Sequence, residues 1–128
     1  MPIWQQKPIY QALQARLAAL DLDLMIGVPR ALQRLPTAYL ASDEIEVPPG
    51  KFSGVRFKPT LTLGVALQEN AAAELQLVDL VDLVATDLMG DSLTGACRCA
   101  VERVDYETRP LGGIDYRFAD LTLVLVSL

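Results

Sequence analysis

The sequence predicts an α+β fold in a single domain: a mixed or antiparallel β-sheet flanked by two main helices, with a protruding β-hairpin arm. Two segments carry apolar residues at helical spacing, and two longer segments alternate apolar with polar or small residues as strands do. The chain has 128 residues, of which 52% are hydrophobic. This length suits one core and is short for two, so we expect residues 1–128 to form one domain.

We expect the first helix at about residues 5–20. Its apolar residues recur at helical spacing on one stripe: Ile9, Leu13, Leu17 and Leu20. Pro8 suits the first turn of this helix. The following stretch is rich in Gly and Pro and has no clean period, which indicates a connection with one short strand around residues 24–28.

The arm is expected as a hairpin at about residues 39–67, with its tip near residues 48–51. A straight second limb over residues 55–67 would span about 43 Å at 3.3 Å per residue. That is about three times the roughly 14 Å radius of a domain of this size, so the limb must bend or project. Pro59 cannot donate a ladder hydrogen bond, which predicts that the outer half belongs to an edge or to the arm.

The second helix is expected at about residues 70–89, with Asn70 as its N-cap and Gly90 as its stop. The residues expected on its core face are Leu77, Val78, Val81, Val84, Ala85 and Leu88. Leu75 and Leu83 fall on the opposite, polar side. They are either ordinary, partly covered leucines or a contact surface for another subunit.

The last third predicts an antiparallel hairpin at about residues 96–126, with its turn at residues 109–113. The inward phase changes by one residue along the first strand, which indicates a bulge near Glu102 and Arg103. Residues 121–126 are apolar on both faces, as expected for a central strand covered by helices on at least one side.

The composition argues against most catalytic chemistry. The chain has no histidine, so serine- or cysteine-histidine catalysis and ordinary zinc sites lack their usual residues. Common nucleotide-binding and hydrolase motifs are also missing from the sequence. Cys97 and Cys99 could be half of a metal site or a redox pair, but with no further Cys or His we expect reduced, buried thiols. We expect no enzyme, no cofactor and no metal site.

Acidic residues outnumber basic ones, and the net charge is −5. This charge disfavours direct nucleic-acid recognition, and no apolar stretch is long enough to span a membrane. The start of the chain lacks the apolar core of a secretion signal, so we expect a soluble protein made in the cytoplasm. Asp43, Glu44 and Glu46 could bind a cation but lack the Gly and terminal Glu of an EF-hand loop, so a solvated strand end is expected. Asp79 and Asp82 are expected to form a solubilising helix face.

Several segments in order carry a resemblance to a known family. They are the opening IYQALQARL, a Pro-punctuated stretch, the strand TLTLGVAL, the helix NAAAELQLVDLVDLVATDL and the terminal YRFADLTLVLVSL. This order resembles tail terminator (tail completion) proteins of long-tailed bacteriophages. The resemblance implies a sheet flanked by helices and a structural virion protein without catalytic residues. It implies hexameric rings that cap the tail tube, form the head-tail junction and contact the tail tube protein and head connector proteins.

The resemblance places the protein in the virion tail or neck, made in the host bacterial cytoplasm, with double-stranded DNA passing through the ring without specific binding. An acidic lumen would favour passage of DNA over binding. A ring also needs two different contact patches. The candidate interface residues are Leu75, Asp79 and Leu83 on the second helix and Lys51, Phe52, Arg56 and Lys58 on the arm. The basic residues of the arm could instead protect an exposed strand edge.

Other assignments remain open. Related phage neck, connector or tail components share this texture. A small α+β ligand-binding module of cellular origin would need an apolar pocket between sheet and helices. An enzyme using Asp or Arg residues has only the presence of such residues in its favour.

Overall fold

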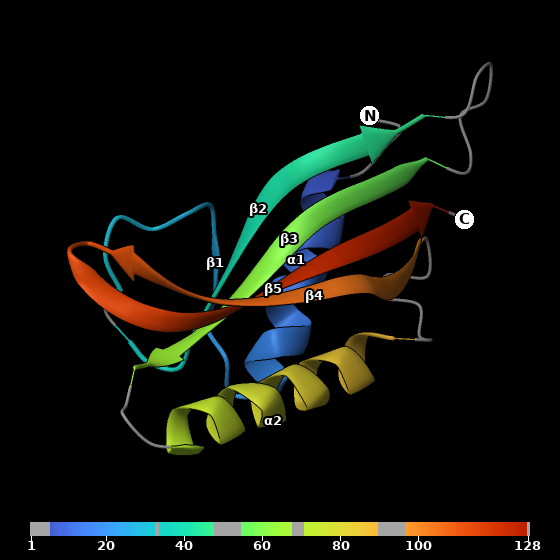
Figure 1. Ribbon diagram of the computed structural model, residues 1–128. Helices are drawn as coiled ribbons and strands as arrows, with labels where there is room; N and C mark the ends of the chain where they lie inside the picture. The colour runs from blue at the N-terminus through green and yellow to red at the C-terminus, as the bar shows by residue number, and fades with distance from the viewer. Residues whose placement is uncertain (1–5, 33, 48–54, 68–70, 90–96, 128) are drawn as a thin grey trace.

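The computed structural model describes residues 6–32, 34–47, 55–67, 71–89 and 97–127. Its helices and strands follow in the order α1 (Gln6–Ala19), β1 (Leu24–Ile26), β2 (Thr37–Glu46), β3 (Arg56–Ala66), α2 (Ala71–Leu88), β4 (Cys97–Leu111) and β5 (Ile114–Ser127). The strands form one five-stranded sheet in the order β1-β2-β3-β5-β4 (Figure 1). β1 pairs parallel to β2, and every other pair is antiparallel. The predicted α+β single-domain arrangement with a mixed sheet is confirmed.

Both helices pack against the same face of the sheet. In Figure 1, α1 passes behind the strands and α2 runs below them. One core cluster joins side chains of both helices with inward residues of the sheet, among them Leu13 and Leu17 of α1, Leu77 and Val84 of α2, Leu61 and Leu63 of β3, and Leu121 and Leu123 of β5. Residues two apart on a strand share a face, so this core takes the odd-numbered positions of β3 and β5.

The predicted apolar stripe of the first helix is confirmed, because Ile9, Leu13 and Leu17 are buried. Arg16 ties this helix to the end of α2: its Nε donates to Oδ2 of Asp87 at 3.1 Å, and its Nη2 donates to the carbonyl oxygen of Asp87 at 2.7 Å. A cation at a helix C-terminus satisfies carbonyl groups that have no partner within the helix.

The core face of α2 differs from the prediction. Its buried residues are Ala73, Leu77, Val81, Val84 and Leu88. The prediction that Val78 lies in the core is wrong, because its side chain is exposed. Ala85, also expected in the core, is only half-buried. A helix lying on a sheet buries a narrow stripe, and Val78 lies roughly 100° around the helix from the centre of that stripe. Asn70 and Gly90, the expected cap and stop, lie outside the described residues.

The protruding arm is not confirmed. β3 is an interior strand even at its outer end, where Arg56 pairs with Glu46 of β2 on one side and with Val126 of β5 on the other. The expectation that the outer half forms an edge is therefore wrong for the described part. The tip, with Lys51 and Phe52, lies outside the described residues.

Pro59 is buried inside this sheet, where a residue without a backbone N–H is usually excluded. The ladder accommodates it through an irregularity in the neighbouring strand. β2 shifts register between Ala41 and Glu44, opposite the stretch of β3 that contains Pro59. A bulge leaves local backbone groups unpaired, so the absence of a backbone N–H at Pro59 breaks no ladder hydrogen bond with β2.

The terminal hairpin agrees with the prediction and is longer than expected on its first strand. The register shifts between Val101 and Arg103, which confirms the bulge. Gly112 and Gly113 take positive φ angles of 62° and 81° in the turn. Cys97 and Cys99 are buried, as expected. β5 is an interior strand that the helices cover on one side, which confirms the central-strand prediction.

Candidate functional site

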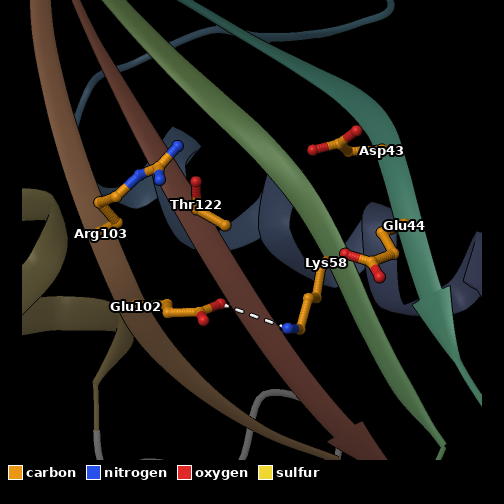
Figure 2. A pocket seen from close by; sticks show the side chains of 6 residues that line it. All are labelled: Asp43, Glu44, Lys58, Glu102, Arg103 and Thr122. Atoms are coloured by element: carbon orange, nitrogen blue, oxygen red, sulfur yellow. Dashed lines mark ion pairs between the residues drawn. The ribbon is translucent and has the colours of Figure 1, made fainter.

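The face of the sheet away from the helices is largely polar and carries a shallow hollow of about 400 Å³. Figure 2 shows side chains from four strands around it. The lining residues are Asp43 and Glu44 of β2, Lys58 of β3, Glu102 and Arg103 of β4, and Thr122 of β5. Because successive strand residues alternate faces, Lys58 points into this hollow while Phe57 points into the core.

Lys58 is the central charge of this hollow. Its Nζ lies 2.9 Å from Oε1 of Glu46 and 3.6 Å from Oε2 of Glu102, so it bridges β2 and β4 across β5. The hydrogen bond to Glu46 raises the pKa of Lys58 against the effect of burial. The same hydrogen bond lowers the pKa of Glu46.

The second cation of the hollow, Arg103, is paired within its own strand. Arg103 pairs with Asp105, with 2.8 Å between its Nε and Oδ2 of Asp105. Among the residues that the structure describes, no group of three His, Cys, Asp or Glu side chains is arranged to hold a metal ion. The interactions described around this hollow are therefore ion pairs, two between strands and one within β4.

A second polar cluster lies at the other end of the same face and centres on Arg109 of β4. Its Nη1 donates to Oδ2 of Asp120 at 2.8 Å and to Oε1 of Glu107 at 2.6 Å, and its Nη2 donates to Oη of Tyr39 at 2.9 Å. Thr62 donates to Oδ1 of Asp120 at 2.6 Å. The cluster therefore links β2, β3, β5 and β4 by side chains alone.

Aromatic rings lie beneath this cluster. The guanidinium of Arg109 stacks 4.4 Å above the ring centre of Phe118, a favourable cation–π geometry. Phe118 meets Tyr39 and Tyr116 edge-on, at 6.4 and 5.9 Å between ring centres. Residue Leu32 of the connection between β1 and β2 packs on these rings from outside. This cluster was not predictable from the sequence, because its members become neighbours only through strand pairing.

The outer side of α2 presents large apolar side chains to solvent. Leu75 is 67% exposed, Leu83 47% and Val78 39%. Asp79 and Asp82 lie on the same side and are exposed. The candidate interface residues Leu75, Asp79 and Leu83 are thus brought together on one surface.

The candidate residues of the arm are not brought together in the same way. Arg56 is exposed on the same face of β3 as Lys58, opposite the buried Phe57. Lys58, however, is engaged with Glu46 and Glu102 inside the sheet.

A further set of exposed apolar side chains was not recognised from the sequence. Ile26, at the end of β1, is 49% exposed, and on the connection between β1 and β2 Val28 is 63% exposed and Leu35 40%. Arg30 and Arg34 are exposed on the same connection. The available signal was the presence of apolar and basic residues in a segment with Gly27 and Pro29 and without helical or strand period.

Within the described ranges, no helix is both long and apolar enough to cross a membrane. Comparison of the chain with models of known protein families and with curated proteins found no match.

Proposed function

We propose that this chain is a structural subunit of the tail terminator type, which forms a ring, expected to be hexameric, at the head-proximal end of a phage tail tube. In this role it caps the tube, contacts the tail tube protein and head connector proteins, and resides in the virion. The order of segments that resembles terminator proteins supports the proposal. The resemblance implies a mixed or antiparallel sheet flanked by helices, and the fold has a five-stranded mixed sheet with two helices packed against it.

The observation that carries the proposal is the exposed apolar side of α2. A helix of a lone soluble domain normally turns its large apolar residues inward, whereas α2 fills the core with one side and shows Leu75, Val78 and Leu83 on the others. Several large apolar side chains exposed on one helix of a folded domain favour a contact with another protein. A neighbouring subunit in a ring would cover it.

The acidic net charge fits a ring through which DNA passes. Each subunit carries −5, so a ring of such subunits repels the phosphate backbone and favours passage over binding.

The ligand-binding alternative receives less support. The space between sheet and helices is filled by side chains such as Leu13, Leu61 and Leu77, which have no exposed surface. The largest hollow described lies on the other face and is lined mainly by charged residues. An apolar ligand would need the reverse arrangement.

The test is the mass of the purified chain in solution, measured by light scattering over a concentration series, with electron microscopy of the same sample. We expect annular particles with about six times the chain mass of 14.0 kDa. A closed two-fold dimer, or a monomer at every concentration, would contradict the proposal. A matched sample of Leu83→Asp is expected to remain folded by circular dichroism and to lose the rings.

A further inference from the structure

A small hollow lies where the connection between β1 and β2 returns to the sheet. It has a volume of about 270 Å³, and its lining residues are Asp23, Met25, Arg34, Pro36 and Thr37. Asp23 and Arg34 are exposed and lie at its rim, whereas Thr37 is only 4% exposed and lies at its floor. The hollow therefore combines a carboxylate, a guanidinium and a buried hydroxyl with the apolar side chains of Met25 and Pro36.

The parallel ladder of β1 and β2 positions the inner side of this hollow. The ladder begins at Leu24 and Ala38, whose side chains belong to the core on the helix side of the sheet. Asp23 and Thr37 precede that pair, so they are neighbours on the face away from the helices. Met25 lies on the same face and packs on its aromatic rings. Two paired strands therefore hold the inner side of the hollow in place.

The hydroxyl of Thr37 has no hydrogen-bond partner among the residues that the structure describes. Thr37 and Thr62 are the buried polar side chains in this part of the chain, and Thr62 donates to Asp120 at 2.6 Å. The methyl group of Thr37 faces β3, because a Cβ added to Gly64 would lie 2.9 Å from its Cγ2. The hydroxyl, about 120° away around the Cα–Cβ bond, is therefore directed away from β3, on the side of the hollow. A buried hydroxyl without a partner is unfavourable, so a group that enters the hollow and bonds to it is stabilised.

The two charged groups at the rim are also unpaired. Among the described residues, Asp23 and Arg34 form no ion pair with each other or with another side chain. Both also line an adjoining hollow of about 230 Å³, which includes Asp21. The opposite charges thus share one opening without neutralising each other. A ligand with one negative and one positive group can pair with both of them at once.

We infer that this hollow binds a free α-amino acid with a small apolar side chain. The ligand carboxylate accepts hydrogen bonds from Arg34 and Thr37, and the ligand ammonium donates to Asp23. The ligand side chain lies against Met25 and Pro36. The hollow is smaller than the roughly 300–1,000 Å³ of sites for drug-sized ligands, so its ligand must be small. A simple carboxylic acid or a phosphate would leave Asp23 unpaired, and a simple amine would leave Arg34 unpaired. The site belongs to a single chain, so the inference does not depend on the proposed function.

Isothermal titration calorimetry of the wild-type chain tests the class of ligand. The probes are L-alanine, L-valine, L-leucine and L-methionine at millimolar concentration, and at least one should bind saturably. The acid and the amine that correspond to the best binder, for L-leucine 4-methylpentanoate and 3-methylbutylamine, should each bind about tenfold or more weakly. No saturable binding of any of the four amino acids overturns the inference. Equal affinity for the amino acid and either analogue also overturns it, because one of the two charged groups is then not recognised.

Substitutions at the rim test the site itself. Arg34→Gln and Asp23→Asn should each weaken binding of the amino acid about tenfold or more, because each removes one charge-assisted hydrogen bond. The matched controls are Arg56→Gln and Asp43→Asn, which neutralise exposed charges outside this hollow. Both controls should bind as the wild type does. Equal weakening by the rim variants and the controls would be an effect of net charge alone and would overturn the assignment of the site.

Thr37→Val separates a ligand-binding hydroxyl from a structural one, since it keeps the shape of the side chain and removes the donor. The hydroxyl has no partner in the free chain, so the free variant should unfold at a temperature no lower than the wild type. It should nevertheless bind the amino acid more weakly. A lower unfolding temperature together with unchanged affinity would overturn the role of Thr37 in binding. Affinity is measured whether or not the chain forms rings, so failure of this inference and failure of the proposed function are distinguishable.

Discussion

Asp120 of β5 accepts hydrogen bonds from Arg109 of β4 on both of its carboxylate oxygens, at 2.8 and 3.0 Å. Burial alone would raise the pKa of Asp120, but hydrogen bonds from Arg109 and Thr62 and the charge of Arg109 outweigh it and lower this pKa. The hydrogen bond with Asp120 likewise raises the pKa of Arg109. This pair holds the open face of the sheet together at its hairpin end.

The first prediction concerns pH. Because the pKa of Asp120 is lower in the folded chain than in the unfolded chain, its contribution to the free energy of unfolding is complete above the unfolded value. It is lost as pH falls through the folded value. Asp120→Asn should cost about 1–3 kcal/mol near neutral pH. Urea unfolding from about pH 6 to about pH 3 should then show a smaller loss of stability for the variant than for the wild type.

Asp43→Asn serves as the control, since it neutralises an exposed carboxylate on β2. It should keep the wild-type pH dependence. Equal pH dependence of Asp120→Asn and the wild type would show that the pair does not contribute to stability in this way.

The helices and strands were predictable because hydrophobic periodicity is a local property of the chain. The orientation of α2 was not. Leu75 and Leu83 are apolar too, so the apolar residues of this helix occupy much more of its circumference than a single stripe. Only the position of the sheet decides that Leu77 is buried and Val78 exposed. The prediction of an edge strand from Pro59 was wrong for a similar reason, because the bulge that accommodates this proline lies on another strand.

The polar clusters depend on register, which the sequence does not contain. Arg109 pairs across the ladder with Tyr116, not with Asp120. Its side chain reaches Asp120 by crossing the ring of Phe118. The exposure of Leu75, Asp79 and Leu83 on one side of α2 was predictable because they share one helix. The exposure of Val28 and Leu35 was not, because no regular structure relates these residues to one another.

The second prediction compares neighbouring positions on α2. Leu77 has no exposed surface, whereas Val78 is exposed. Leu77→Ala should lower the free energy of unfolding by about 2–5 kcal/mol, because it leaves a cavity in the core. Val78→Ala should change it by less than about 1 kcal/mol. Chemical denaturation of both variants as monomers, in the Leu83→Asp background, provides the measurement. Comparable losses at both positions would contradict the observed orientation of the helix.

The third prediction concerns Gly64 of β3. A Cβ at this position would lie 2.7 Å from Cε1 of Phe118 and 2.9 Å from Cγ2 of Thr37. Both neighbours are buried, so they have little room to move. Gly64→Ala should cost about 1–3 kcal/mol through overpacking. Adding Phe118→Leu should recover part of that loss relative to Phe118→Leu alone. Thermal unfolding of the four chains tests this coupling, and simple additivity would exclude the clash as the cause.

The last prediction uses the two cysteines as reporters of opening. Burial, followed by the neighbouring Cys97 thiol, raises the pKa of Cys99 to about 12, although Arg16 opposes this rise. At pH 8 the folded chain therefore holds about a thousandfold less Cys99 thiolate than an ordinary cysteine would. A thiol reagent should modify both cysteines at once in denaturant and neither at a comparable rate in the folded chain. Because labelling then requires unfolding, Leu77→Ala should accelerate it about tenfold for each 1.4 kcal/mol of stability lost. Equal labelling rates in Leu77→Ala and the wild type would instead mean that the strand end carrying Cys97 and Cys99 opens without global unfolding.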